Sequence, residues 1–341
     1  MSADAAPVPG RTVADSVDEL LAGASRREPF VPAETRSTAR FERVWVDGEP
    51  MVLKYLHADD DFAMRATGDV GSRVLLAWTA GLFDVAADLV DHAVVGAARG
   101  VGRHGWGAAL LMRDASTDLV PPGDDEFPEA RHDGFIGALA GVCARTWGWR
   151  DQLGLLPYAS RWTFFGPDTL DAERAQGWPE PVPRIAAQGW QAFAERAPAD
   201  VAASVDALRR DVGPLVSALQ QTPSCFLHGD WKASNLGTAA DGRTVLLDWV
   251  YLGEGPACHE LGWYLALNRA KLPSARPKER VVEQFRAALE SHGVATGEWW
   301  DRQLALSLLG TLVEFGWEKA LGDDAELGWW CDRAREGLAR L

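Results

Sequence analysis

One stretch, residues 225–251 with the sequence CFLHGDWKASNLGTAADGRTVLLDWVY, constrains the fold of this chain more than any other. Its first apolar residues predict a short buried strand, which ends shortly before Asp230, and Asn235 follows five positions later. The Asp-Gly pair at 241–242 suits a tight turn and predicts a β-hairpin. The second strand of that hairpin would carry Asp248 back to Asp230 and Asn235.

These three polar residues have the spacing that phosphoryl transfer from a nucleoside triphosphate requires. Asp230 would accept and orient a hydroxyl proton, while Asn235 and Asp248 would hold Mg²⁺ on the phosphate oxygens, because hard cations prefer oxygen ligands. The alternative is that Asp230 and Asp248 only cap a turn and the end of a strand. That alternative does not account for all three residues together, so phosphoryl transfer is the working hypothesis.

A second hairpin is predicted over residues 41–46 and 51–56, with Asp-Gly at 47–48 as its turn. Lys54 lies between apolar residues in the second of these strands. Burying an ammonium group is costly unless it meets an anion, and in a kinase such a lysine contacts the α- and β-phosphates. Taken alone, Lys54 is better interpreted as an edge-strand lysine that points to solvent, but with the downstream residues the phosphate-binding interpretation is preferred.

Two further features would complete a nucleotide site around Lys54. Ser37 and Thr38 precede the hairpin, where a phosphate-covering loop would lie, although a plain turn explains this segment equally well and no GxGxxG motif occurs there. No glutamate follows Lys54 in this part of the chain, and Asp69, ahead of an apolar helical run, is the preferred acidic partner. The other candidates are Asp59, Asp60, Asp61 and Asp84.

The remaining patterns predict two lobes. We expect an N-terminal extension with a short helix over 1–28, a small nucleotide-binding lobe over 29–113 and a mainly helical lobe over 114–341. The connection at about residues 112–115 would receive the adenine, with Met112, Arg113 and Asp114 supplying backbone hydrogen bonds.

Composition excludes several classes of protein. The chain has 341 residues, 47% of them hydrophobic, which suits a globular protein large enough for two lobes. Its net charge of −15 argues against nucleic acid as a partner and is compatible with a cationic small substrate. No apolar run predicts a membrane span and residues 1–10 lack a signal-peptide pattern, so we expect a cytoplasmic protein. The four cysteines are far apart and are expected in the core, without disulfides or zinc.

Acidic residues and tryptophans occur together near the C-terminal end of the sequence. They could form an acidic, aromatic-lined surface for a substrate, or a solvated helix face over a tryptophan core. The residues concerned are Glu314, Trp317, Glu318, Asp323, Asp324 and Trp329.

The motifs HGDWKASN at 228–235 and LLDW at 246–249, with Lys54 and the run LLM at 110–112, resemble the aminoglycoside phosphotransferase/choline kinase family of small-molecule kinases. The resemblance extends from about residue 30 to the C-terminus. It implies an α+β, protein-kinase-like bilobal fold, with a small antiparallel sheet in one lobe, a larger helical lobe, and ATP or GTP with Mg²⁺ in the cleft. The chain departs from the family pattern in lacking a glutamate after Lys54 and in having Glu260 where an aspartate usually starts a helix.

The resemblance also implies roles for individual residues. Asp230 would be the catalytic base, Asn235 and Asp248 the metal ligands, and Lys54 the phosphate-binding lysine. His228 would fix the catalytic loop. By the same comparison with protein kinases, Lys232 would reach the γ-phosphate, unless it is simply a surface lysine.

The expected activity is therefore O-phosphotransfer to a small hydroxylated molecule. A protein acceptor is disfavoured, because a long segment separates the connection between the lobes from Asp230 and no APE-type motif follows Asp248. An antibiotic or other sugar-bearing natural product is preferred, such as an aminoglycoside, a nucleoside antibiotic or an amino sugar, which would make this a resistance enzyme. The alternatives are a kinase of primary metabolism, for choline, a sugar or an amino alcohol, and a nucleotide-binding pseudokinase. We expect a monomer or homodimer without nucleic-acid or membrane partners.

Overall fold

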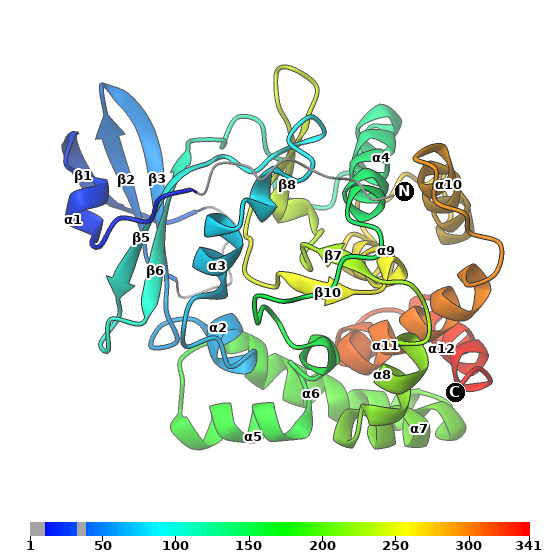
Figure 1. Ribbon diagram of the computed structural model, residues 1–341. Helices are drawn as coiled ribbons and strands as arrows, with labels where there is room; N and C mark the ends of the chain where they lie inside the picture. The colour runs from blue at the N-terminus through cyan, green and yellow to red at the C-terminus, as the bar shows by residue number, and fades with distance from the viewer. Residues whose placement is uncertain (1–10, 33–38) are drawn as a thin grey trace.

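The computed structural model describes residues 11–32 and 39–341, which form a small sheet-containing lobe and a larger helical lobe (Figure 1). The small lobe is built on one antiparallel sheet with the strand order β1-β2-β3-β6-β5. Its strands are β1 (Ala24–Phe30), β2 (Phe41–Val46), β3 (Glu49–Leu56), β5 (Val94–Val101) and β6 (Gly107–Arg113). This arrangement confirms the predicted α+β bilobal fold.

The predicted hairpin is formed by β2 and β3. Asp47 and Gly48 both have positive φ, 51° and 84°, which is the backbone conformation of a two-residue turn that favours Asp-Gly. Strand β3 pairs with β2 on one side and with β6 on the other, so Lys54 lies in a central strand rather than at the edge of the sheet.

The helices of the small lobe are short. They are α1 (Val17–Leu20), α2 (Phe62–Ala66) and α3 (Arg73–Thr79). Helix α1 begins at Val17, because the Ser16 side chain caps it by accepting the Glu19 N–H while Ala14 forms a β-bridge with Ala98. Strand β1 starts at residue 24, ahead of the lobe boundary predicted at residue 29.

Nine α-helices occupy the described part of the large lobe, and α11 is the longest of them. They are α4 (Glu129–Arg145), α5 (Pro167–Gln176), α6 (Pro181–Arg196), α7 (Ala199–Arg210), α8 (Gly213–Leu219), α9 (Ala257–Leu267), α10 (Lys278–Ser291), α11 (Trp300–Ala320) and α12 (Asp324–Leu338). The buried helix α11 packs against α6, α9 and α12. The four cysteines are buried and free, as predicted. None of the helices in the described ranges is long and apolar enough to cross a membrane.

Short strands lie between these helices, and most of them belong to the functional stretch, residues 225–251. They are β4 (Val90–Asp91), β7 (Cys225–Leu227), β8 (Leu236–Thr238), β9 (Thr244–Leu246) and β10 (Gly253–Gly255). Strands β8 and β9 form the hairpin predicted around Asp241 and Gly242, and their antiparallel pairing is continued where the Leu247 N–H donates to Asn235 O at 2.9 Å. Gly242 in the turn has φ of 89°, a value that favours glycine.

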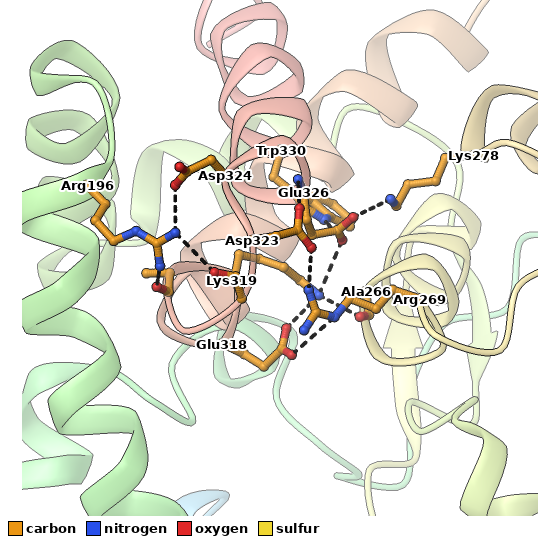
Figure 2. A network of polar contacts seen from close by, with 12 residues as sticks. Arg196, Ala266, Arg269, Lys278, Glu318, Lys319, Asp323, Asp324, Glu326 and Trp330 are labelled. Atoms are coloured by element: carbon orange, nitrogen blue, oxygen red, sulfur yellow. Dashed lines mark hydrogen bonds and ion pairs between the residues drawn. The ribbon is translucent and has the colours of Figure 1, made fainter. Parts of the chain in front are cut away.

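A polar network ties α9, α10, α11 and α12 together (Figure 2). Lys319 of α11 is fully buried, and its Nζ donates to Ala266 O of α9 at 2.6 Å. Glu326 of α12 accepts a hydrogen bond from the Trp330 indole at 2.7 Å and pairs with Lys278 of α10 at 2.5 Å. This network fixes the C-terminal end of α9. Near its other end, α9 contacts the functional stretch.

Helix α2 of the small lobe contacts α5 and α6 of the large one (Figure 1). Arg65 pairs with Glu173 at 2.8 Å and with Glu180 at 2.5 Å. Beside this ion pair, the rings of Phe62 and Phe165 stack with their centroids 5.7 Å apart. The two lobes are therefore joined by α2 as well as by the connection after β6.

Candidate active site

The loop after β7 is held in place through its backbone. Gly229 has φ of 84°, and a Cβ at this position would lie 2.7 Å from Tyr251 O, so only glycine fits. The Asp230 N–H donates to Nδ1 of His228, so the ring proton lies on Nε2, which donates to Leu247 O at 3.0 Å. Burial lowers the pKa of His228 to about 3, which keeps the ring neutral. His228 thus links the loop to the strand that delivers Asp248.

Asp230 lies at the centre of this loop and is fully buried. Its Oδ2 accepts hydrogen bonds from Lys232 Nζ at 2.7 Å and from Asn235 Nδ2 at 2.8 Å. Its Oδ1 accepts one from the Trp263 indole at 3.0 Å. Burial raises the pKa of Asp230, against the opposing effect of the Lys232 ammonium. The result is an oriented carboxyl group with an increased affinity for protons.

Asp248 brings the two lobes into contact at this point. Its Oδ1 lies 2.5 Å from Nζ of Lys54, which comes from β3 of the small lobe. Burial alone would raise the pKa of Asp248, but Lys54 and Lys232 lower it below its ordinary value. Asp248 has φ of 65°, an uncommon conformation for a residue with a side chain and one that clusters at functional sites.

The structure therefore brings together four residues that the sequence analysis identified, Lys54, Asp230, Asn235 and Asp248. Lys232 joins them: burial disfavours its ammonium form, but Asp230 and Asp248 outweigh this effect and raise its pKa. Lys232 is half-buried and contacts Asp230, so it is not an isolated surface lysine.

The predicted partnership of Lys54 with Asp69 is absent from the structure. Both carboxylate oxygens of Asp69 accept the Arg73 N–H at 3.1 Å, at the start of α3, because this carboxylate satisfies an amide of the first helical turn. The ion pair described for Lys54 is the one to Asp248. The predicted phosphate contacts of Ser37 and Thr38 lie outside the described residues.

Asp61 is the carboxylate that accompanies Lys54 and Asp248 instead. It caps the start of α2 by accepting the Ala63 N–H at 2.8 Å. Burial raises its pKa, with Lys54 opposing that effect and Asp248 adding to it, which places Asp61 within the electrostatic reach of both. Its position directly before an apolar helix was the sequence signal for an N-cap, and that signal did not distinguish it from its acidic neighbours.

The connection between the lobes is fixed by ion pairs. Arg113, the last residue of β6, pairs with Asp91 and with Asp118, both at 2.7 Å. Its neighbours also have defined positions: Met112 is buried in the sheet, and Asp114 accepts the amide of a residue two positions later. The role of this segment in holding adenine stays a prediction.

Helix α9 and the residue that follows it supply four hydrogen bonds to the loop, from three side chains, that the sequence did not indicate. Glu260 Oε1 accepts the Gly229 N–H at 2.7 Å, and Trp263 donates to the carboxylate described above. Asn268, just after the helix, accepts the Ala233 N–H at 2.6 Å and donates to Trp231 O at 2.9 Å. Their spacing along one helical face would have been the only signal, and a buried helix shows the same spacing without such a function.

The acidic and aromatic residues near the C-terminus do not form one surface. Glu314 and Trp317 are buried, and neither the Glu314 oxygens nor the Trp317 indole nitrogen has a hydrogen-bond partner in the described part of the chain. Burial raises the pKa of Glu314, with Arg161 opposing. By contrast, Glu318 and Asp323 belong to the network in Figure 2.

Comparison with known proteins decides the family. Residues 76–300 match the sequence profile of the phosphotransferase enzyme family. The chain belongs to this family. A comparison with curated protein sequences finds no match.

Two solved structures with a similar fold are small-molecule kinases. Choline kinase LicA from Streptococcus pneumoniae is 11% identical in sequence, with a TM-score of 0.50 over 95% of this chain and 98% of that one. The microcompartment-associated aminopropanol kinase is 12% identical, with a TM-score of 0.52 over 94% of each chain. At these identities the similarity establishes the fold of the phosphotransferase and leaves its acceptor open.

Proposed function

We propose that this phosphotransferase moves the γ-phosphoryl group of ATP or GTP to a hydroxyl group of a small molecule. The observation that carries the proposal is the contact between Lys54 of one lobe and Asp248 of the other, at 2.5 Å, beside the buried pair of Asp230 and Lys232. A cation from the sheet, two carboxylates and a second cation around one point are the groups that position phosphates and an attacking hydroxyl.

Each residue has a distinct task in this proposal. Asp230 accepts the proton of the acceptor hydroxyl, a task favoured by its raised pKa. Lys54 exchanges its contact with Asp248 for the α- and β-phosphates, and Asp61 remains nearby as its counter-charge. Lys232 stabilises the charge that develops on the transferred phosphoryl group.

The site also fits Mg²⁺. Asn235 Oδ1 and Asp248 Oδ2 accept no hydrogen bond from any residue in the described ranges, and both are the oxygen ligands that this ion prefers. No group of three or more His, Cys, Asp or Glu residues suited to a metal occurs in those ranges, so water and phosphate oxygens would complete the coordination. Bound there, Mg²⁺ would neutralise phosphate charge.

The nucleotide would lie against the connection between the lobes. Backbone groups at Met112, Arg113 and Asp114 would bind the adenine or guanine ring. The Arg113 N–H already donates to Ala93 O at 2.8 Å, so carbonyl groups and the later amides are the available partners. Ser37 and Thr38 would contact the phosphates.

We further propose that the acceptor carries an amine. The net charge of −15 would attract a cation. An aminoglycoside, a nucleoside antibiotic or an amino sugar meets this requirement, which would make the enzyme a resistance factor, and an amino alcohol of primary metabolism meets it as well.

The test is nucleotide consumption with paired acceptors that differ only in an amino group. We expect wild-type protein with MgATP or MgGTP to phosphorylate the amine-bearing member of a pair, with the product located by mass spectrometry and NMR. Asp230→Asn should abolish product. Equal product from wild type and Asp230→Asn would contradict the assigned base. Nucleotide binding without turnover on any acceptor would favour a regulatory pseudokinase.

A further inference from the structure

The three hydrogen-bond donors on Asp230 are distributed unevenly over its two oxygens. Each carboxylate oxygen can accept about two hydrogen bonds. Both positions on Oδ2 are taken, by Lys232 at 2.7 Å and by Asn235 at 2.8 Å. Oδ1 accepts only the Trp263 indole, at 3.0 Å, within the part of the chain that the structure describes. One acceptor position of the carboxylate is therefore left, and it lies on Oδ1.

The indole that occupies the other position of Oδ1 is held firmly. Trp263 is only 4% exposed and lies in the middle of α9. Its ring contacts Phe315 edge-on, with centroids 4.9 Å apart, and Tyr251 at 5.6 Å. A ring packed on both sides cannot turn its N–H away without breaking these contacts. The direction of the remaining position on Oδ1 is therefore fixed.

We propose that Trp263 is a positioning residue, which fills one acceptor position of Asp230 Oδ1 and so leaves a single direction from which the acceptor hydroxyl can donate its proton. This inference rests on the proposed function. In the reaction, the hydroxyl proton passes to Oδ1 while the hydroxyl oxygen forms a bond to the γ-phosphorus. The bond from that phosphorus to the bridging oxygen breaks, and the nucleoside diphosphate leaves with the electron pair.

Without the indole N–H, water could occupy either position on Oδ1, and the hydroxyl would lose its fixed approach. Catalysis depends steeply on such alignment. Oδ2 would keep its two donors, so the carboxylate would stay in the site and nucleotide binding would not change. The expected signature is a lower kcat with an unchanged KM for the nucleotide.

Two substitutions at Trp263 separate the hydrogen bond from the bulk of the ring. Trp263→Phe keeps an aromatic ring and removes the donor. Trp263→His keeps a five-membered ring with an N–H at the corresponding position and removes the fused six-membered ring. The matched control is Trp330→Phe, because Trp330 is fully buried and its indole donates to the Glu326 carboxylate at 2.7 Å, in the network far along the chain from the loop (Figure 2).

The assay is steady-state hydrolysis of MgATP by the full-length chain, with water as the only acceptor. Trp263→Phe should lower kcat about tenfold, with KM for ATP within about twofold of wild type. Trp263→His should recover most of kcat. Trp330→Phe should leave kcat unchanged although it lowers the unfolding temperature by a similar amount. The Trp263 indole N–H resonance, assigned in the wild type through its contacts with the Tyr251 and Phe315 rings, should shift in Asp230→Asn.

Several results would overturn the inference. A kcat for Trp263→Phe equal to wild type would do so, as would a Trp263→His variant no better than Trp263→Phe, because ring packing would then be decisive. An equal loss in Trp330→Phe would assign the effect to general stability. An indole resonance unmoved by Asp230→Asn would exclude the hydrogen bond even if the Trp263 variants do not fold. A wild-type protein that transfers phosphate neither to water nor to any acceptor of the paired panel would contradict the proposed function itself, and this inference with it.

Discussion

Replacing Asn268 with alanine tests whether α9 holds the loop that contains Asp230. The Asn268 side chain is buried, and it makes three hydrogen bonds. It accepts the Ala233 N–H at 2.6 Å and donates to Trp231 O and to Tyr264 O, both at 2.9 Å. Two of these bonds reach the loop itself, so their removal should affect both stability and catalysis.

The magnitude follows from the number of bonds. A hydrogen bond in a folded protein contributes about 1 kcal/mol net, so loss of three should lower the free energy of unfolding by about 3 kcal/mol. The Ala233 N–H would also be left buried without a partner. Since Asn235 lies two residues beyond Ala233, a shift of the loop would move a proposed metal ligand. We expect kcat to fall about ten- to hundredfold.

The matched control is Gln303→Ala. Gln303 is a buried amide that also accepts one backbone N–H, from Cys258 at 3.2 Å, and donates two hydrogen bonds, to Thr222 Oγ1 at 2.8 Å and to Pro223 O at 2.7 Å. Urea unfolding and MgATP hydrolysis are measured for both variants. Similar losses of stability are expected, with a large loss of kcat in Asn268→Ala alone. Equal kcat values in the two variants would refute the reasoning that this amide positions the loop.

Three further predictions concern other parts of the site. Lys54→Met should raise KM for the nucleotide at least about tenfold through loss of the phosphate contact, as measured by steady-state kinetics, and an unchanged KM would remove Lys54 from the site. Burial raises the pKa of Glu260 to about 7 from the ordinary value of 4.5, so the folded state holds this proton to higher pH than the unfolded state does. The free energy of unfolding should therefore fall as pH rises from about 4.5 to about 7, and Glu260→Gln should flatten this slope; parallel pH profiles would contradict the assignment. Arg65→Met leaves Glu173 and Glu180 without their cation and should lower the unfolding temperature by several degrees, as measured by calorimetry, whereas no change would mean that this contact between the lobes is unimportant.

Local geometry predicted the grouping of Asp230, Asn235 and Asp248, whereas the fold and the place of Lys54 were predicted from the resemblance of the motifs to a known family. An Asp-Gly turn reverses the chain within two residues, and the hairpin register then returns Asp248 to Asn235 whatever surrounds them. The acidic partner of Lys54 was not predictable in the same way. Several aspartates follow β3, and the choice among them depends on where α2 begins and how it packs on the other lobe.

The same limit explains why the contacts from α9 were missed. Trp263 and Asn268 are separated from the loop by about 30 residues of chain, and nothing in the local pattern distinguishes a buried tryptophan that donates to Asp230 from one that only fills the core. Catalytic groups are recognisable by residue type and spacing. Their supports are recognisable only when burial and donor–acceptor partners are known, because many residue types can perform that task.

Glu260 shows how a departure from a family pattern can be understood at this level. The resemblance stated above leads one to expect an aspartate at the start of this helix, and glutamate is longer by one methylene group. Its Oε1 nevertheless accepts the Gly229 N–H at 2.7 Å, so the loop keeps its tie to α9. Oε2 is buried without a hydrogen-bond partner in the described residues, and burial raises the pKa of the group to about 7. A protonated Glu260 can still accept the Gly229 N–H, which holds the loop, and it avoids a second negative charge beside Asp230. The longer side chain is therefore compatible with the same reaction.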